Sequence, residues 1–228
     1  MRPPHSIKAV IFGATGMVGE GVLHEALKDE SVEAVLAVGR RPCEVIHPKL
    51  TEILHTDFYD YTSLRTALTG FNACFFCLGV TSVGKSEELY RRLTYDLTLA
   101  AATALSASNP DMVFCYVSGQ GTDSREQGRL MWARVKGRTE NDLQKLPFKS
   151  VYLFRPGMIQ PMPGMKHTLP IVKPFAPLFP LLKFFFPASV CTLEDVGRAM
   201  VRVTTAGYEK RILETPDITL LGRKRFTQ

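Results

Sequence analysis

Three glycines at a fixed spacing form the strongest chemical signal in the sequence. Gly13, Gly16 and Gly19 follow the apolar run 7–12 and open the segment 17–28, whose apolar residues recur with a helical period. A turn without side chains lets the backbone approach a pyrophosphate, whose charge is stabilised by a helix N-terminus. An ordinary strand-to-helix turn is the alternative. The predicted pyrophosphate loop consists of Gly13, Ala14, Thr15, Gly16, Met17, Val18 and Gly19.

Two arginines stand where a dinucleotide site reads the adenosine ribose. About twenty residues past the glycines, NAD-binding proteins usually place an Asp or Glu on the ribose 2′-hydroxyl. Here the run 32–38 ends in Gly39, Arg40 and Arg41. A guanidinium attracts a 2′-phosphate, which a carboxylate would repel. The sequence therefore predicts NADP(H) in preference to NAD(H), with a solvated pair of loop arginines as the alternative.

Further cofactor contacts are expected at the ends of two more apolar runs. After 50–56, an Asp can hydrogen-bond the adenine amino group and an aromatic ring can cover the base. At the end of 71–78, a small residue lets the backbone pass close to the nicotinamide ribose. The residues expected at these places are Asp57, Phe58, Leu78, Gly79 and Val80.

All these residues lie at the ends of apolar runs that alternate with amphipathic segments. The predicted strands are 7–12, 32–38, 50–56, 71–78, 112–117 and 150–155, and the predicted helices are 17–28, 62–68, 87–106, 127–146 and 193–205. This alternation indicates a doubly wound parallel α/β sheet of the Rossmann type, whose ligands bind beyond the carboxyl ends of the strands. We expect one such domain over residues 1–228. Thr192 and Asp195 have the spacing of a capping box, and 212–214 and 218–220 are expected as short strands.

The segment 156–192 interrupts the alternation and is expected to form a C-terminal lid or substrate region. Its eight prolines prevent a continuous helix, and the part 166–187 is rich in Phe and Leu. A membrane-spanning helix is disfavoured because prolines and lysines interrupt the run. Two alternatives remain for 166–187. It lines an apolar substrate pocket, or it forms an exposed patch that meets a protein partner or a membrane surface.

The composition is typical of a globular α/β protein. The 228 residues carry a net charge of +6, but Lys and Arg are spread along the chain, so we expect no nucleic-acid partner. An odd number of cysteines and the lack of an apolar leader predict a cytoplasmic location, with the membrane surface as the peripheral alternative. Cys74 and Cys77 are expected as core thiols on opposite faces of a strand. The scattered histidines predict no metal site.

Several of these segments together resemble a known family. The glycine loop, Asp57-Phe58, Leu78-Gly79, the run 116–119 (Tyr-Val-Ser-Gly) and the run 155–157 (Arg-Pro-Gly) are similar to the atypical short-chain dehydrogenases/reductases. Within them, the chain resembles the small NAD(P)H-binding branch of the Tat-interacting protein and the epimerase-like proteins, from about residue 7 to 205. The resemblance implies that Pro156 and Gly157 also contact the cofactor.

The same resemblance implies a catalytic set from which one member is missing. In members that transfer hydride, a tyrosine exchanges a proton with the substrate, and a serine polarises the carbonyl. A lysine four residues after the tyrosine lowers the pKa of the phenol and also binds the nicotinamide ribose of the cofactor. Ser118 and Lys136 match, but Trp132 occupies the tyrosine position. An indole N–H cannot exchange a proton near neutral pH. The ordinary alternatives are a turn residue for Ser118 and a solvated helix lysine for Lys136.

The sequence thus supports two hypotheses. The favoured one is an NADP(H)-binding regulatory or interaction protein that lacks the catalytic tyrosine. The other is an NADP-dependent oxidoreductase or isomerase that acts on an apolar carbonyl compound through a different acid.

Overall fold

Parallel strands form the central sheet of the computed structural model, which describes residues 6–162 and 179–223. The seven strands run in the order β3-β2-β1-β4-β5-β6-β9, and each neighbouring pair is parallel. The predicted doubly wound α/β fold is confirmed. The strands of this sheet are β1 (Ile7–Phe12), β2 (Val32–Gly39), β3 (Leu50–Leu54), β4 (Ala73–Phe76), β5 (Val113–Val117), β6 (Ser150–Arg155) and β9 (Ile212–Glu214).

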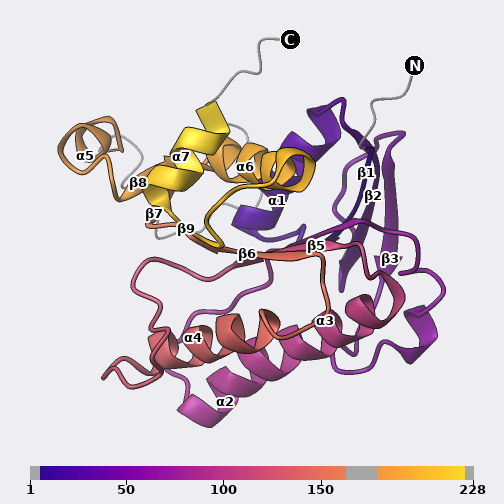
Figure 1. The fold of residues 1–228 in the computed structure, drawn as a ribbon, viewed down its shortest axis with the longest axis horizontal. Coiled ribbons are helices and arrows are strands. Elements are labelled where there is room, and N and C mark those ends of the chain that lie inside the picture. The colour runs from indigo at the N-terminus through magenta and orange to yellow at the C-terminus, as the bar shows by residue number, and fades with distance from the viewer. Residues whose placement is uncertain (1–5, 163–178, 224–228) are drawn as a thin grey trace.

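Helices cover both faces of the sheet (Figure 1). On the upper face in this view lie α1 (Met17–Lys28), α6 (Leu193–Ala206) and α7 (Thr215–Arg223). On the lower face lie α2 (Glu87–Arg91), α3 (Leu97–Ser108) and α4 (Met131–Leu143). A π turn at 92–96 joins α2 to α3, so the predicted helix 87–106 exists with one irregular turn.

The alternation of side chains along each strand divides the core into two layers. Ile11 of β1 packs in the layer below α1 and α6, whereas Phe12 packs in the layer that faces α3. Cys74 belongs to the α3 layer, and Cys77 packs against the other one. The expectation that these two thiols lie on opposite faces is therefore confirmed.

The chain after β6 differs from its prediction in three places. Two short strands, β7 (Met158–Gln160) and β8 (Val190–Thr192), pair in parallel as a separate small sheet. Helix α5 (Phe179–Phe185) forms despite Pro180, because the first helical turn tolerates proline. The residues 218–220, predicted as a strand, lie inside α7, because Thr215, Pro216 and Asp217 form a helix start that overrides the short apolar pattern. Residues 163–178 of the predicted lid lie outside the described residues.

Local hydrogen bonds explain the other differences in boundary. Helix α4 begins at Met131 rather than 127, because the Asp123 carboxylate accepts the backbone N–H groups of Arg125, Gln127 and Gly128 and holds that segment as a loop. The predicted helix 62–68 is a 3₁₀ turn at Thr62–Leu64. The predicted capping box is confirmed: Thr192 and Asp195 each accept the other's backbone N–H. No helix in the described ranges is long and apolar enough to cross a membrane.

Candidate functional site

The glycine turn joins β1 to α1 in a geometry that tolerates no side chain at Gly13 or Gly19. Gly13 has a φ of +81°, and a Cβ there would lie 2.9 Å from the backbone of Cys77. A Cβ at Gly19 would overlap the carbonyl oxygen of Gly13. Gly16 is the N-cap of α1 and is exposed. The exposed N-cap Gly16 therefore leaves the first turn of α1 open at this position to a ligand such as a pyrophosphate.

A cleft of about 780 Å³ begins at this helix end and extends beyond β4, β5 and β6. Its size is typical of a cofactor or substrate site. The predicted residues that line it are Gly16, Met17, Val18, Leu78, Gly79, Val80, Ser118, Trp132, Lys136, Pro156 and Gly157. Residues that line it without having been predicted are Cys77, Thr81, Val117, Gly119, Gln120, Met158, Ile159 and Ser189.

The remaining predicted residues lie outside the lining of this cleft. Gly13, Ala14, Thr15 and Gly19 form the turn behind Gly16. Arg40 and Arg41 are exposed just after β2.

Asp57 and Phe58 follow β3 and differ from each other in exposure. Asp57 is exposed, and its Oδ1 accepts the backbone N–H of Tyr59 at 2.9 Å. Phe58 is 6% exposed and packs edge-on against Phe12, with 6.4 Å between the ring centroids. Phe58 thus contributes its ring mainly to the core below the end of β1.

Lys136 extends from α4 to the end of β5. Its Nζ donates to the carbonyl oxygen of Ser118, and the side chain lines the cleft. Burial disfavours the charged form and lowers the pKa of Lys136 to about 8, although the charge of Glu140 acts in the opposite direction. An amine with this pKa changes its protonation state close to physiological pH.

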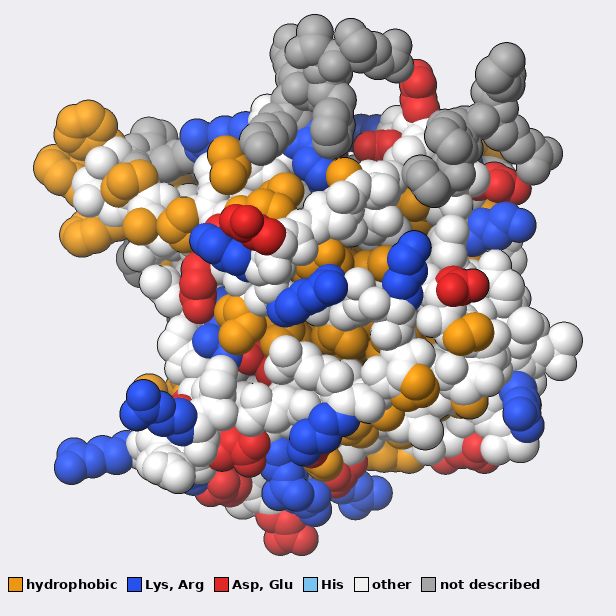
Figure 2. All heavy atoms as spheres, in the orientation of Figure 1, with side chains coloured by type: hydrophobic (Ala, Val, Ile, Leu, Met, Phe, Trp, Pro, Cys, Tyr) orange, Lys and Arg blue, Asp and Glu red, His pale blue; other side chains and the backbone are white. Residues whose placement is uncertain are grey.

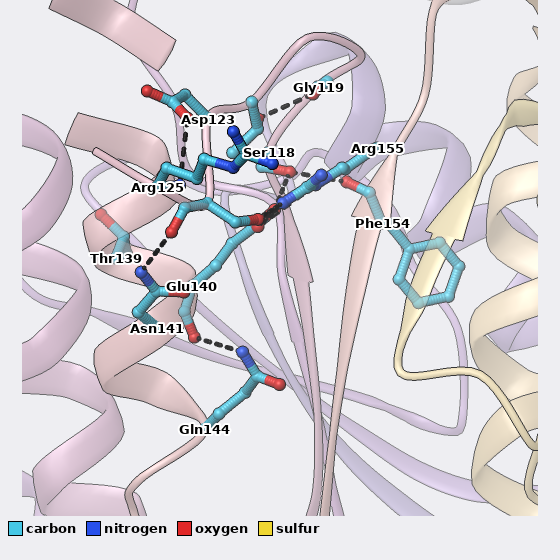
Figure 3. A network of polar contacts seen from close by, with 12 residues as sticks. Ser118, Gly119, Asp123, Arg125, Thr139, Glu140, Asn141, Gln144, Phe154 and Arg155 are labelled. Carbon is cyan, nitrogen blue, oxygen red and sulfur yellow. Dashed lines mark hydrogen bonds and ion pairs between the residues drawn. The ribbon is translucent and has the colours of Figure 1, made fainter. Parts of the chain in front are cut away.

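Ser118 directs its hydroxyl away from the cleft. Its Oγ donates to Oε1 of Glu140 at 2.5 Å and lies 3.2 Å from the carbonyl oxygen of Phe154 (Figure 3). A serine has one hydroxyl proton, and here that proton is used inside the protein. The polarising role that the resemblance implied for Ser118 would therefore require this hydrogen bond to break.

Glu140 and Arg155 form a buried ion pair below the cleft (Figure 3). Nε of Arg155 donates to Oε1 of Glu140 at 3.0 Å, and a terminal nitrogen of Arg155 donates to Oε2. Burial disfavours the charge of Arg155, but the hydrogen bonds and charges of Glu140 and Glu214 outweigh it and raise its pKa. Sequence reasoning did not select Glu140. Its position four residues after Lys136, on the same helical face, is the signal that could have identified it.

Trp132 lies one helical turn before Lys136 and is half-buried in the wall of the cleft. A Cβ at Gly121 would lie 3.5 Å from its ring, so the loop before α4 packs against the indole. Further along α4, a Cβ at Gly137 would overlap the carbonyl oxygen of Asp123 in the same loop. The residues of α4 that face the cleft are thus positioned by direct contact with this loop.

Comparison with known proteins gives relatives in fungi and no family model that matches. Protein fmp52, mitochondrial, of Emericella nidulans is 30% identical over 156 residues, which are 65% of this chain and 65% of that protein. Protein FMP52, mitochondrial, of Debaryomyces hansenii is 26% identical over 205 residues, 87% of this chain and 88% of that protein. The first match thus spans just under two thirds of the relative's length. These relatives are named as mitochondrial proteins. Their names contradict the cytoplasmic location that was expected from the sequence.

Solved structures share the fold at low sequence identity. The Bordetella bronchiseptica enzyme WbmG, solved in complex with NAD, has a TM-score of 0.68 and 12% identity over 92% of this chain and 72% of that one. Uronate dehydrogenase from Agrobacterium tumefaciens has a TM-score of 0.66 and 13% identity, covering 96% of this chain and 84% of that one. The chain therefore has the Rossmann fold that these enzymes share.

Proposed function

We propose that this protein binds NADP(H) in the cleft that begins at α1. The observation that carries the proposal is the turn around Gly16, where a helix N-terminus with an exposed glycine as its N-cap opens directly into the cleft. The pyrophosphate would lie at Gly16 and Met17, and the nicotinamide end would lie between Leu78, Trp132 and Lys136. WbmG, which shares the fold, was solved with NAD, and this supports a nicotinamide dinucleotide as the ligand.

The preference for the phosphorylated cofactor rests on Arg40 and Arg41. Both are exposed directly after β2, next to the β1–α1 turn in the sheet order. Two guanidiniums there would bind a 2′-phosphate through charge-assisted hydrogen bonds, and neither could reproduce the contact of a carboxylate with a free 2′-hydroxyl.

The single tryptophan of the chain provides the test, because Trp132 lines the cleft. Titration with NADPH should quench its fluorescence and transfer energy to the reduced nicotinamide, with a lower Kd than for NADH. The double variant Arg40→Ala/Arg41→Ala should lose this preference. Arg65→Ala/Lys149→Ala removes the same charge from exposed positions outside the cleft and should keep it. Equal affinities of the parent protein for NADPH and NADH would contradict the proposed preference.

A second function, the reduction of an apolar carbonyl compound, is favoured by the lining of the cleft beyond the cofactor site. Met158, Ile159 and Val117 contribute apolar surface there, and Lys136 contributes a charge. Met158 and Ser189 come from the region 156–192, which supports our proposal that this region takes part in substrate binding. Turnover of lipophilic aldehydes and ketones with NADPH would test this function.

The surface around helix α5 supports a third part of the proposed function, which is contact with a lipid membrane. Phe184, Phe185 and Phe186 are 78%, 63% and 59% exposed. Hydrophobic side chains project at this end of the molecule, at the upper left of Figure 2. Three successive exposed aromatics are costly in water and are typical of a surface that inserts at a membrane interface. Since the curated relatives are named mitochondrial, we propose a mitochondrial membrane as that surface.

A further inference from the structure

Carbonyl reduction needs a proton donor, and two of the usual groups cannot supply it here. Hydride addition to the carbonyl carbon leaves negative charge on the oxygen, which a nearby acid must neutralise. Trp132 stands in the usual position of that acid, and its indole N–H is not acidic. The hydroxyl of Ser118 points to Glu140.

Tyr116, Tyr95 and Cys77 are also unsuited to donate this proton. Tyr116 is 1% exposed, and burial raises its pKa. The hydroxyl of Tyr95 donates to Asp142 at 2.7 Å, and neither tyrosine lines the cleft. Cys77 does line it, but burial raises the pKa of its thiol to about 12. Among the described residues that line the cleft, Lys136 is the one with a charged side chain.

Resting on the proposed binding of NADP(H), we propose that the ammonium group of Lys136 is itself the acid that protonates the carbonyl oxygen of the substrate. The bound dinucleotide would supply the hydride that forms the new C–H bond, and the C=O π pair would move to oxygen. An N–H bond of Lys136 breaks as the O–H bond of the product alcohol forms. Lys136 is left as a neutral amine and regains a proton from water.

The geometry around Lys136 suits this role. An ammonium has three N–H donors, and one of them is directed to the Ser118 carbonyl oxygen, which leaves two for a ligand in the cleft. The position of that carbonyl is itself fixed by two hydrogen bonds of Ser118. The backbone N–H of Ser118 donates to the carbonyl oxygen of Phe154, and the hydroxyl of Ser118 donates to the carboxylate of Glu140. Ser118 and Glu140 are thus positioning residues for the Lys136 side chain. The desolvation that lowers the pKa of Lys136 to about 8 makes the proton available near neutral pH.

The first test measures the protonation of Lys136 without any turnover. In the full chain labelled with ¹⁵N-lysine, the Nζ signal of Lys136, assigned through Lys136→Arg, should titrate near pH 8. Lys145, just beyond the end of α4, is the internal control. Its hydrogen bond to Asp142 raises its pKa, so it should titrate well above Lys136. If Lys136 titrates together with Lys145, the proposal is overturned.

The second test separates the proton from the charge. Lys136→Arg keeps a cation that does not deprotonate. Its turnover of carbonyl compounds, measured at NADPH concentrations that saturate the variant by Trp132 fluorescence, should fall by about 100-fold or more. Lys136→Met removes both the charge and the proton, and should lose turnover to the same extent. Thermal unfolding of each variant checks that it is folded.

The outcomes distinguish this proposal from the cofactor proposal. A parent protein that does not bind NADPH contradicts the proposed function itself. Two outcomes contradict only the assignment of Lys136 as the acid. In the first, the parent protein binds NADPH but reduces none of the lipophilic aldehydes and ketones tested. In the second, the Lys136→Arg variant retains turnover.

Discussion

The hydroxyl of Ser118 and the carboxylate of Glu140 lie 2.5 Å apart, although Ser118 directly follows β5 and Glu140 belongs to α4, 22 residues later. Glu140 also binds Arg155 at the end of β6, so one carboxylate connects β5, β6 and α4. Val117 of β5, Lys136 of α4 and Pro156, which directly follows β6, line the cleft. The buried charges therefore set the shape of the site without touching a ligand.

Replacement of Glu140 by Gln should destabilise the fold strongly. It leaves the guanidinium of Arg155, whose side chain is 10% exposed, with the partly exposed Glu214 at 3.6 Å as its charged partner. Loss of one member of a buried pair typically costs about 3–5 kcal/mol. Urea denaturation of Glu140→Gln should show a loss of this size in the free energy of unfolding.

The exposed pair Arg91–Asp96 provides the control. Arg91→Gln should change the free energy of unfolding by about 0–1 kcal/mol. Glu140→Gln/Arg155→Met should recover part of the loss, because it removes the unpaired cation. A Glu140→Gln protein as stable as Arg91→Gln would show that the pair contributes nothing.

Two alanine substitutions in the glycine turn should have different effects. A Cβ at Gly19 would overlap Gly13, so Gly19→Ala should lower the free energy of unfolding by about 1–3 kcal/mol. At Gly16 the nearest atom would be 3.3 Å away, and the methyl group would enter the cleft. Gly16→Ala should therefore fold but bind NADPH at least about tenfold more weakly, a loss of about 1.4 kcal/mol. Thermal unfolding and Trp132 fluorescence measure the two effects, and a reversed order would contradict the placement of the pyrophosphate.

The fold and the glycine turn could be predicted because their signals are local. Most of the strands are predominantly apolar runs, and Gly13, Gly16 and Gly19 follow closely after one of them. The contact between Ser118 and Glu140 could not be predicted in this way. A glutamate in the middle of a helix normally indicates a solvated position, and its partner Arg155 comes from a distant strand.

The second wall of the cleft was missed for a different reason. β7 and β8 have three residues each, too few for an alternating pattern to be recognised. Met158, Ile159 and Ser189 reach the cleft only because these strands pair across a long stretch of sequence. Their positions depend on tertiary pairing and not on local preference.

Introduction of a tyrosine at Trp132 should supply a second acid. In Trp132→Tyr, the phenol would lie one helical turn before Lys136, whose charge would lower the phenol pKa. We expect carbonyl turnover to rise and to survive the additional change Lys136→Arg. Trp132→Phe, which adds no proton, should show no gain. If Lys136→Arg abolishes turnover equally in the Tyr variant, residue 132 does not face the reacting carbonyl.

The pH dependence of turnover should reflect the lowered pKa of Lys136. Reduction requires the ammonium form, so its rate should be highest below pH 8 and should fall as the pH rises through about 8. Oxidation of the alcohol requires the neutral amine, so its rate should rise over the same range. Initial rates in both directions measure this, and profiles without opposite slopes near pH 8 would contradict the assignment.

Removal of the exposed aromatics at the end of α5 and directly after it should abolish membrane binding. Phe184→Ser/Phe185→Ser/Phe186→Ser removes a large exposed apolar area from one end of the molecule. Co-sedimentation with vesicles that contain anionic lipid should be lost, while NADPH binding should persist. Leu220→Ser removes an exposed apolar side chain on α7 and should leave sedimentation unchanged. Equal sedimentation of the triple variant and the parent would exclude α5 as the contact surface.

The backbone contact between Gly137 and Asp123 has a consequence for how the cleft adapts to a ligand. No side chain fits between them, and the N–H of Asp123 also donates to the carbonyl oxygen of Ala133 at 3.1 Å, so we expect the loop and α4 to move as one body. Lys136 lies beside Gly137 on that body, so its position is set before any ligand arrives. Induced fit, and slow amide hydrogen exchange that changes on binding, should therefore be concentrated in the opposite wall, at β7 and β8.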